Sequence, residues 1–116
     1  MERGARTPEE LDTLLEDAFV VRDVETLAGL FEDSGVLVNG CGEARGRAEI
    51  RRMASEMWRH DRHYFADPDA VLQSRGLALV VARRATSVVR RGGDGVWRYA
   101  IALLSDDETT TKEEYG

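Results

Sequence analysis

The spacing of apolar residues changes once along the chain, and this change most constrains the fold. Up to about residue 62, apolar residues recur mainly at the spacing of amphipathic helices. From His63 onward they recur at every second residue, which is typical of strands. Helices that are segregated from a run of antiparallel strands form an α+β architecture. With 116 residues, the chain has the length of a single domain.

Three helices are predicted in the first part of the chain. Thr7 and Glu10 form a capping box that starts the first helix. Asp23 is a second cap, and it predicts a short helix that runs to Phe31. A third helix is expected over about residues 47–60, where apolar residues lie on one face.

Strands are predicted at 36–38, 77–82, 85–91 and 96–105. The glycine-rich sequence 92–95 between the last two is a hairpin loop. In the last strand, the larger side chains alternate with smaller ones and are expected to share one face of the sheet. These side chains belong to Trp97, Tyr99, Ile101 and Leu103.

Two features of the strand region are less regular. A strand region is expected to begin at Tyr64 and Phe65, and Pro68 interrupts it, which predicts a sheet edge or a bulge. Arg83 and Arg84 are not typical turn residues. The sequence therefore leaves two alternatives there, a turn between two strands and one long bent strand.

Charge and cysteine content exclude several functions. The net charge of −6 argues against a nucleic-acid partner, because binding phosphates needs a basic face. Cys41 is the only cysteine, so no internal disulfide can form. No apolar run reaches the roughly 20 residues of a membrane helix, and we expect a cytoplasmic protein. Its domain is expected over residues 8–105, between a flexible segment 1–7 and an acidic, disordered tail 106–116.

Three local sequences, in this order along the chain, resemble those of one protein superfamily. They are Asp23–Asp33 for a helix pair, Gly46–Ile50 for the start of the third helix, and Arg90–Ile101 for the closing hairpin. The resemblance is to the nuclear transport factor 2-like superfamily, in its SnoaL-like branch, and it covers about residues 8–105. It implies a cystatin-like topology in which a curved antiparallel sheet wraps three helices around a cone-shaped pocket. It also implies a homodimer that forms through the sheet.

The superfamily includes ketosteroid isomerases, whose chemistry needs a tyrosine, a carboxylate base and a protonated acid. Counted from the matching motifs, these positions fall on Leu15, Asn39 and Val88. None of these side chains can perform the acid–base step, so the resemblance does not extend to isomerase chemistry. The sequence therefore favours a protein that is not an enzyme of this type.

Two other activities of the superfamily have partial support. Epoxide hydrolysis needs two carboxylates joined by an arginine, and Asp67, Asp69 and Arg83 or Arg84 have that chemistry. Their position in loops and at strand ends makes an interior triad doubtful. Polyketide cyclases need an acid or histidine in the pocket, and the residues after Ile101 supply none.

Two further patterns are weak. Gly40, Gly42 and Gly46 lie between a strand and a helix, as in dinucleotide-binding loops, but the parallel strand–helix units of that fold are missing. His60 and His63 have no third ligand at a fixed spacing for a metal. We therefore expect no cofactor and no metal.

Two hypotheses from different classes follow. The first is a pocket or association domain that binds a small hydrophobic molecule or a partner protein. The second is a SnoaL-like enzyme that acts on a cyclic hydrophobic ketone, with His63, Tyr64 and Asp67 as candidate catalytic residues. Candidate pocket residues, for which core packing is the alternative, are Asn39, Cys41, Trp58, Tyr64, Trp97 and Tyr99. The dimer is expected through a sheet face that carries Val81 and Val89.

Overall fold

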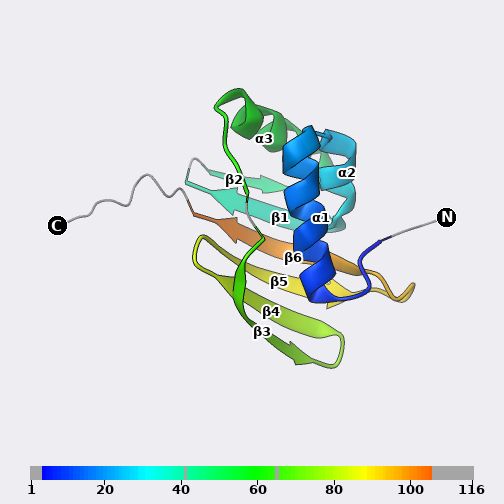
Figure 1. The fold of residues 1–116 in the computed structure, drawn as a ribbon. Coiled ribbons are helices and arrows are strands. Elements are labelled where there is room, and N and C mark those ends of the chain that lie inside the picture. The colour runs from blue at the N-terminus through cyan, green and yellow to red at the C-terminus, as the bar shows by residue number, and fades with distance from the viewer. Residues whose placement is uncertain (1–3, 41, 65, 106–116) are drawn as a thin grey trace.

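The computed structural model describes residues 4–40, 42–64 and 66–105. Three helices lie against one face of a six-stranded curved sheet, which confirms the predicted α+β class (Figure 1). The helices are α1 (Pro8–Val21), α2 (Val24–Gly29) and α3 (Arg47–Arg59). The strands are β1 (Phe31–Asn39), β2 (Gly42–Arg45), β3 (Pro68–Ser74), β4 (Leu77–Ala82), β5 (Ala85–Arg91) and β6 (Trp97–Leu104).

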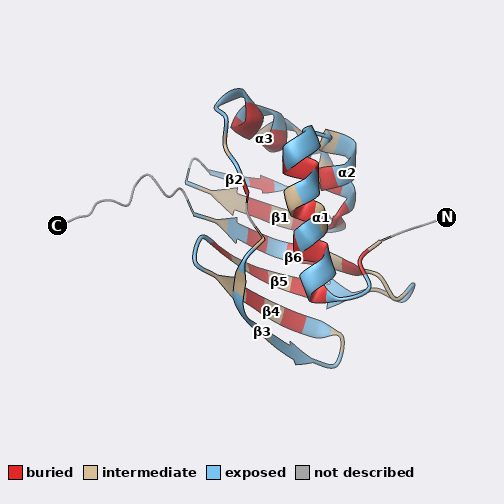
Figure 2. Cartoon of the chain, viewed as in Figure 1, coloured by how far each residue is buried: buried red, intermediate tan, exposed pale blue. Residues whose placement is uncertain are grey.

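The sheet has the strand order β2-β1-β6-β5-β4-β3. Neighbouring strands are antiparallel, except that β1 and β6 run parallel. Pro68 begins β3, which is an edge strand, in agreement with the expectation for a proline at this place. Figure 2 shows that buried stretches alternate with exposed or half-buried ones along α1 and along β4, β5 and β6, because each of these elements buries mainly one face. The edge strand β3 has no buried residue.

The two helix starts that the sequence predicts have the expected caps. The Thr7 hydroxyl accepts a hydrogen bond from the Glu10 backbone N–H at 3.0 Å. Asp23 accepts one from the Thr26 backbone N–H at 3.2 Å. Between the two helices, Arg22 adopts a left-handed conformation with φ 56°, which ends α1 and turns the chain into α2.

The predicted boundary between the second helix and the first strand is wrong. We expected the helix to reach Phe31, but α2 ends at Gly29 and β1 begins at Phe31. Phe31 is fully buried and pairs with Tyr99 on the neighbouring strand β6. The centres of the two rings lie 5.1 Å apart, and the rings are tilted by 36°. Tertiary contacts of this aromatic pair therefore override the helical spacing of the local sequence.

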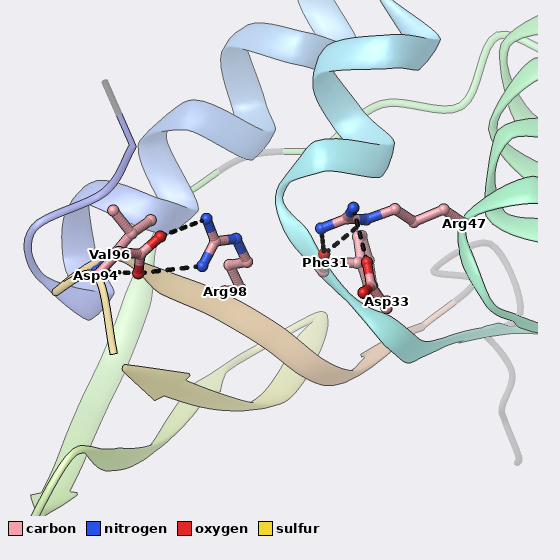
Figure 3. A network of polar contacts seen from close by, with 6 residues as sticks. All are labelled: Phe31, Asp33, Arg47, Asp94, Val96 and Arg98. Atoms are coloured by element: carbon pink, nitrogen blue, oxygen red, sulfur yellow. Dashed lines mark hydrogen bonds and ion pairs between the residues drawn. The ribbon is translucent and has the colours of Figure 1, made fainter. Parts of the chain in front are cut away.

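Arg47 and Asp94 explain two of the motifs in structural terms (Figure 3). The guanidinium of Arg47 donates to the Phe31 carbonyl oxygen at 2.7 and 3.1 Å. Asp94 accepts from the Val96 backbone N–H at 3.1 Å and pairs with Arg98 at 2.9 Å, which fixes the hairpin loop before β6. Hydrogen bonds from Arg98 lower the pKa of Asp94 to about 2. These contacts of the motif residues stabilise the fold.

The face assignment in β6 is wrong for half of the strand. A register shift opposite Val88 and Val89 lets β6 accommodate one additional residue. Trp97 and Tyr99 consequently face the helices and are 2% and 0% exposed. Ile101 and Leu103 face the other side of the sheet and are 39% and 44% exposed. A bulge of this kind leaves no clear mark in the sequence.

Three smaller differences concern loops and short strands. The glycine-rich sequence after β1 is a hairpin turn into β2, a strand that we did not predict. Tyr64 precedes β3 as irregular chain rather than beginning a strand. Of the two alternatives at Arg83 and Arg84, the structure has the tight turn, with β4 and β5 paired on either side.

The segment before α1 contacts the sheet. Ala5, within the range 1–7 that we expected to be flexible, is fully buried, and its carbonyl accepts a hydrogen bond from the Trp97 backbone N–H at 2.9 Å. The expected tail at 106–116 lies outside the described residues. Among the residues that the structure describes, no helix is long and apolar enough to cross a membrane.

Candidate functional site

A cavity of about 500 Å³ lies at one end of the molecule. The last residues of α1, β1, α3 and β6 meet the β4–β5 turn there. The connection from α3 to β3 runs across this end of the sheet, as Figure 1 shows in green. The cavity is lined by Phe19, Asn39, Met57, Asp61, Arg62, His63, Tyr64, Asp67, Ala82, Arg83, Arg84, Ala85, Leu104 and Ser105.

The lining separates into an inner wall and a charged rim. The apolar part of the buried or half-buried wall consists of Phe19, Met57, Ala82, Ala85 and Leu104. Asn39 and Arg62 are half-buried polar members of the same wall. Tyr64 is the buried polar residue of this wall. The exposed rim carries charges of both signs from Asp61, Asp67, Arg83 and Arg84. An apolar interior with a small number of polar groups is typical of small-molecule sites.

Four of the candidate catalytic and pocket residues lie together at this cavity. They are Asn39, His63, Tyr64 and Asp67. Arg83 and Arg84, which were considered with Asp67 for epoxide hydrolysis, also line it, whereas Asp69 does not. Asn39 uses its side-chain oxygen to accept a hydrogen bond from the Gly42 backbone N–H at 3.2 Å, which stabilises the β1–β2 turn. At least one polar group of the proposed site therefore also has a structural role.

The other predicted pocket residues do not line the cavity. Trp58, Trp97 and Tyr99 are buried in the core between the helices and the sheet. Trp58 packs edge-on against Phe19 at 5.6 Å, so it supports the cavity wall from behind. Core packing, the alternative that we gave for these aromatic residues, is what the structure has. Cys41 lies outside the described residues.

A buried polar cluster that sequence analysis missed lies behind the cavity wall. Asp12, on the inner face of α1, is 1% exposed. Its Oδ1 accepts a hydrogen bond from the Tyr99 hydroxyl, and the Tyr64 hydroxyl interacts with both groups. Asp12 Oδ2 is buried and has no hydrogen-bond partner. Because Tyr64 also lines the cavity, it connects this cluster to the site.

The position of Asp12 in α1 contains a signal that we overlooked. Asp12 lies three residues before Leu15 and seven before Phe19, which are both buried on the inner face of the helix. A carboxylate at this spacing is therefore on the apolar face. Buried acidic side chains are rare unless they are paired, so this position indicates a specific role.

The environment of the cluster disfavours its charged forms. Burial raises the pKa of Asp12, and its hydrogen bonds with Tyr99 and Tyr64 only partly oppose this. Burial, and then the nearby charge of Asp12, raise the pKa of Tyr64. Burial likewise raises the pKa of Tyr99. All three groups are therefore biased towards their neutral, hydrogen-carrying states.

The raised pKa of Asp12 predicts a pH dependence of stability. Because the folded-state pKa lies above the unfolded value, the contribution of Asp12 is complete below the unfolded pKa and is lost as pH rises through the folded pKa. The loss is about 1.4 kcal/mol for each unit of the shift. Asp12→Asn, which cannot titrate, is expected to lack this decline.

Urea unfolding of the wild type and Asp12→Asn across pH 4 to 9 measures this effect. The difference between the two proteins removes the contribution of the other acidic groups, which titrate in both. We expect the difference to shift in favour of the asparagine variant as pH rises. Parallel profiles over the whole range would show that Asp12 titrates alike in the folded and unfolded chains.

Comparisons with known proteins agree with the fold of the chain. The family model described as SnoaL-like domain matches residues 11–107. A comparison with curated proteins gives no significant match. Three solved structures that resemble the chain are described below. Each shares 20% sequence identity or less with it, so these structures show the fold alone.

The three structures illustrate the range of related proteins. A ketosteroid isomerase-like protein from Erwinia carotovora atroseptica has 20% identity and a TM-score of 0.70, over 84% of this chain and 91% of its own. An NTF2-like protein with a cystatin-like fold from Novosphingobium aromaticivorans has 17% identity and a TM-score of 0.68, over 89% and 81%. ActVI-ORFA from Streptomyces coelicolor has 19% identity and a TM-score of 0.67, over 86% and 95%.

Proposed function

Because the chain belongs to the SnoaL-like domain family, we propose that it binds a small hydrophobic molecule in the cavity at the end of the sheet. The observation that carries this proposal is the cavity of about 500 Å³, with its apolar wall and its buried Tyr64. Its volume lies within the usual range of ligand pockets, about 300–1,000 Å³.

The proposed function does not include ketosteroid-isomerase chemistry. Leu15, at the position counted from the motifs for the tyrosine of the isomerases, is a buried core residue. Val88, near the position counted for their acid, pairs with Ile101 on the sheet face opposite the helices. Asn39 is at the cavity, but its amide cannot act as a base.

An enzyme that acts on a cyclic hydrophobic ketone is the second candidate. The observation that favours it is the cluster of Asp12, Tyr64 and Tyr99, because strongly shifted pKa values are frequent at catalytic sites. Structural hydrogen-bond networks shift pKa values as well, so the binding function has the broader support.

Titration with 2-acetylnaphthalene, a compact aromatic ketone, tests the proposed function. The naphthalene ring suits the apolar wall, and its fluorescence reports transfer out of water. We expect saturable binding of one molecule per chain. Absence of binding up to the solubility limit of the probe would contradict the proposal.

A homodimer through the outer sheet face is the second part of the proposal. Val81 lies on this face, opposite the helices, whereas Val89 is 0% exposed and faces the core. The strand register brings together Val36, Val38, Leu72, Leu77, Leu79, Val81, Val88, Ile101 and Leu103. A contiguous apolar face of this kind is uncommon on monomers.

Leu103→Glu is expected to separate the proposed dimer into monomers, because it would bury a charge at the centre of the interface. The matched control is Val20→Glu, at an apolar side chain on α1 that is 75% exposed and distant from this face. Light scattering at micromolar concentration measures the mass of each protein. A monomeric wild type, or a dimeric Leu103→Glu variant, would contradict the dimer.

A further inference from the structure

The hydrogen-bonding capacity of the buried cluster restricts what Tyr64 can offer to a ligand. Asp12, Tyr64 and Tyr99 come from α1, from the connection between α3 and β3, and from β6. Their polar groups interact with one another behind the cavity wall. Of the three residues, only Tyr64 also lines the cavity. A ligand would therefore meet the cluster through Tyr64.

The protonation state of Asp12 decides how many hydrogens this cluster needs for itself. An ionised carboxylate only accepts hydrogen bonds, so both tyrosine hydroxyls would direct their hydrogens at it. A neutral carboxyl group has one O–H donor of its own and carries no charge that needs both tyrosine hydrogens. The Tyr99 hydroxyl already donates to Asp12 Oδ1. With a neutral Asp12, the hydrogen of Tyr64 is thus available to a group outside the cluster.

The buried, unpartnered Oδ2 of Asp12 favours the neutral state. An ionised carboxylate with one oxygen that lacks any donor would carry a large desolvation cost, whereas a proton on that oxygen removes the charge. The groups that face Asp12 add no positive charge. They are Tyr99 from β6, Tyr64 from the α3–β3 connection and Glu9 from the same helix as Asp12. Glu16, also on that helix, adds negative charge near Tyr64.

We propose that Tyr64 is the ligand-recognition residue of the cavity and donates its hydroxyl hydrogen to an acceptor oxygen of the ligand. Asp12 and Tyr99 are positioning residues that direct this hydrogen into the cavity. The apolar wall around Tyr64, with Phe19 at 5.8 Å between ring centres, suits a ring system. The ligand class is therefore an apolar cyclic molecule with a carbonyl group or a similar acceptor oxygen. This inference rests on the proposed binding function.

Two probes of nearly equal shape test the donor. They are 2-acetylnaphthalene, which has a carbonyl oxygen, and 2-isopropenylnaphthalene, in which a CH₂ group replaces that oxygen. The measured quantity is the ratio of the ketone affinity to the alkene affinity, which the hydrogen bond from Tyr64 is expected to raise about 3- to 10-fold, as for one net hydrogen bond. Tyr64→Phe is expected to lower this ratio by that factor, because the ketone oxygen then has no donor, and to leave the affinity for the alkene unchanged.

The variant Asp12→Asn tests whether Asp12 directs the hydrogen of Tyr64 or only packs against its neighbours. The amide NH₂ of asparagine donates at every pH, so the hydrogen of Tyr64 stays available and the preference for the ketone persists. In the wild type, the preference is expected to fall as pH rises through the raised pKa of Asp12. In Asp12→Asn it is expected to stay level. A cluster with only a structural role would give the two proteins the same pH profile.

The outcomes distinguish this inference from the proposed function. If the ratio of the two affinities is the same in the wild type and in Tyr64→Phe, Tyr64 does not donate to the ketone, and the pocket is left standing. Binding of neither probe to the wild type overturns the pocket and, with it, this inference. Preference for the ketone that depends on Tyr64 supports both.

Discussion

Truncation of Trp97 to alanine is expected to lower the free energy of unfolding by about 3–5 kcal/mol, as for other large buried side chains. Trp97 is 2% exposed at the start of β6, where its backbone pairs with Ala5 and the Arg91 guanidinium lies 5.7 Å from its ring centre. The cavity lies at the other end of the same strand, beside Leu104. The affinity of the folded variant for 2-acetylnaphthalene is therefore expected to be unchanged.

Chemical unfolding and probe titration of Trp97→Ala measure the two quantities. Val20→Ala is the control, because the Val20 side chain on α1 is 75% exposed and lies outside both the core and the proposed dimer face. We expect a smaller loss of stability there than at Trp97. A Trp97→Ala variant that stays stable but loses probe binding would restore Trp97 to the pocket, as the sequence first suggested.

Ala82→Trp is expected to weaken binding of 2-acetylnaphthalene strongly while the protein remains folded. Ala82 is half-buried at the end of β4 and lines the cavity, so an indole ring there would occupy the space of the probe. The loss of roughly 100 Å² of apolar burial by the probe would cost about 2.5 kcal/mol. This cost corresponds to an affinity weaker by roughly 60-fold.

Ala48→Trp provides the control for the added indole. Ala48 is exposed in the first turn of α3 and does not line the cavity. This variant is expected to bind the probe as the wild type does. If Ala82→Trp also bound the probe with wild-type affinity, the ligand would have to lie elsewhere on the protein.

Local sequence signals predicted the elements that depend on local chemistry. The caps at Thr7 and Asp23 and the hairpin loop before β6 were placed correctly, because each is stabilised within a few residues of itself. The start of β1 was wrong, because Phe31 is held by Tyr99 and Arg47, which are distant in the sequence. The periodicity of β6 was misleading for a similar reason, since its bulge exists only in relation to β5.

The candidate site could be predicted in part. Asn39, His63, Tyr64 and Asp67 were expected near a pocket and do lie at the cavity. The large aromatic residues Trp58, Trp97 and Tyr99 were harder to place, because core and pocket positions have the same composition.

Asp12 was overlooked because its partners are contributed by the other half of the chain. Its position on the apolar face of α1 could have identified it as a buried acid. The identity of its partners, Tyr64 and Tyr99, depends on the tertiary arrangement of the α3–β3 connection and β6.

A crystal structure of the protein with 2-acetylnaphthalene tests the central claim most directly. We expect the naphthalene ring between Phe19, Met57 and Leu104, with the ketone oxygen within hydrogen-bonding distance of the Tyr64 hydroxyl. We also expect Asp12 and Tyr99 to keep their hydrogen bond behind it. A cavity filled by its own side chains, with the probe absent or bound at the outer sheet face, would contradict the claim that this chain is a small-molecule pocket domain.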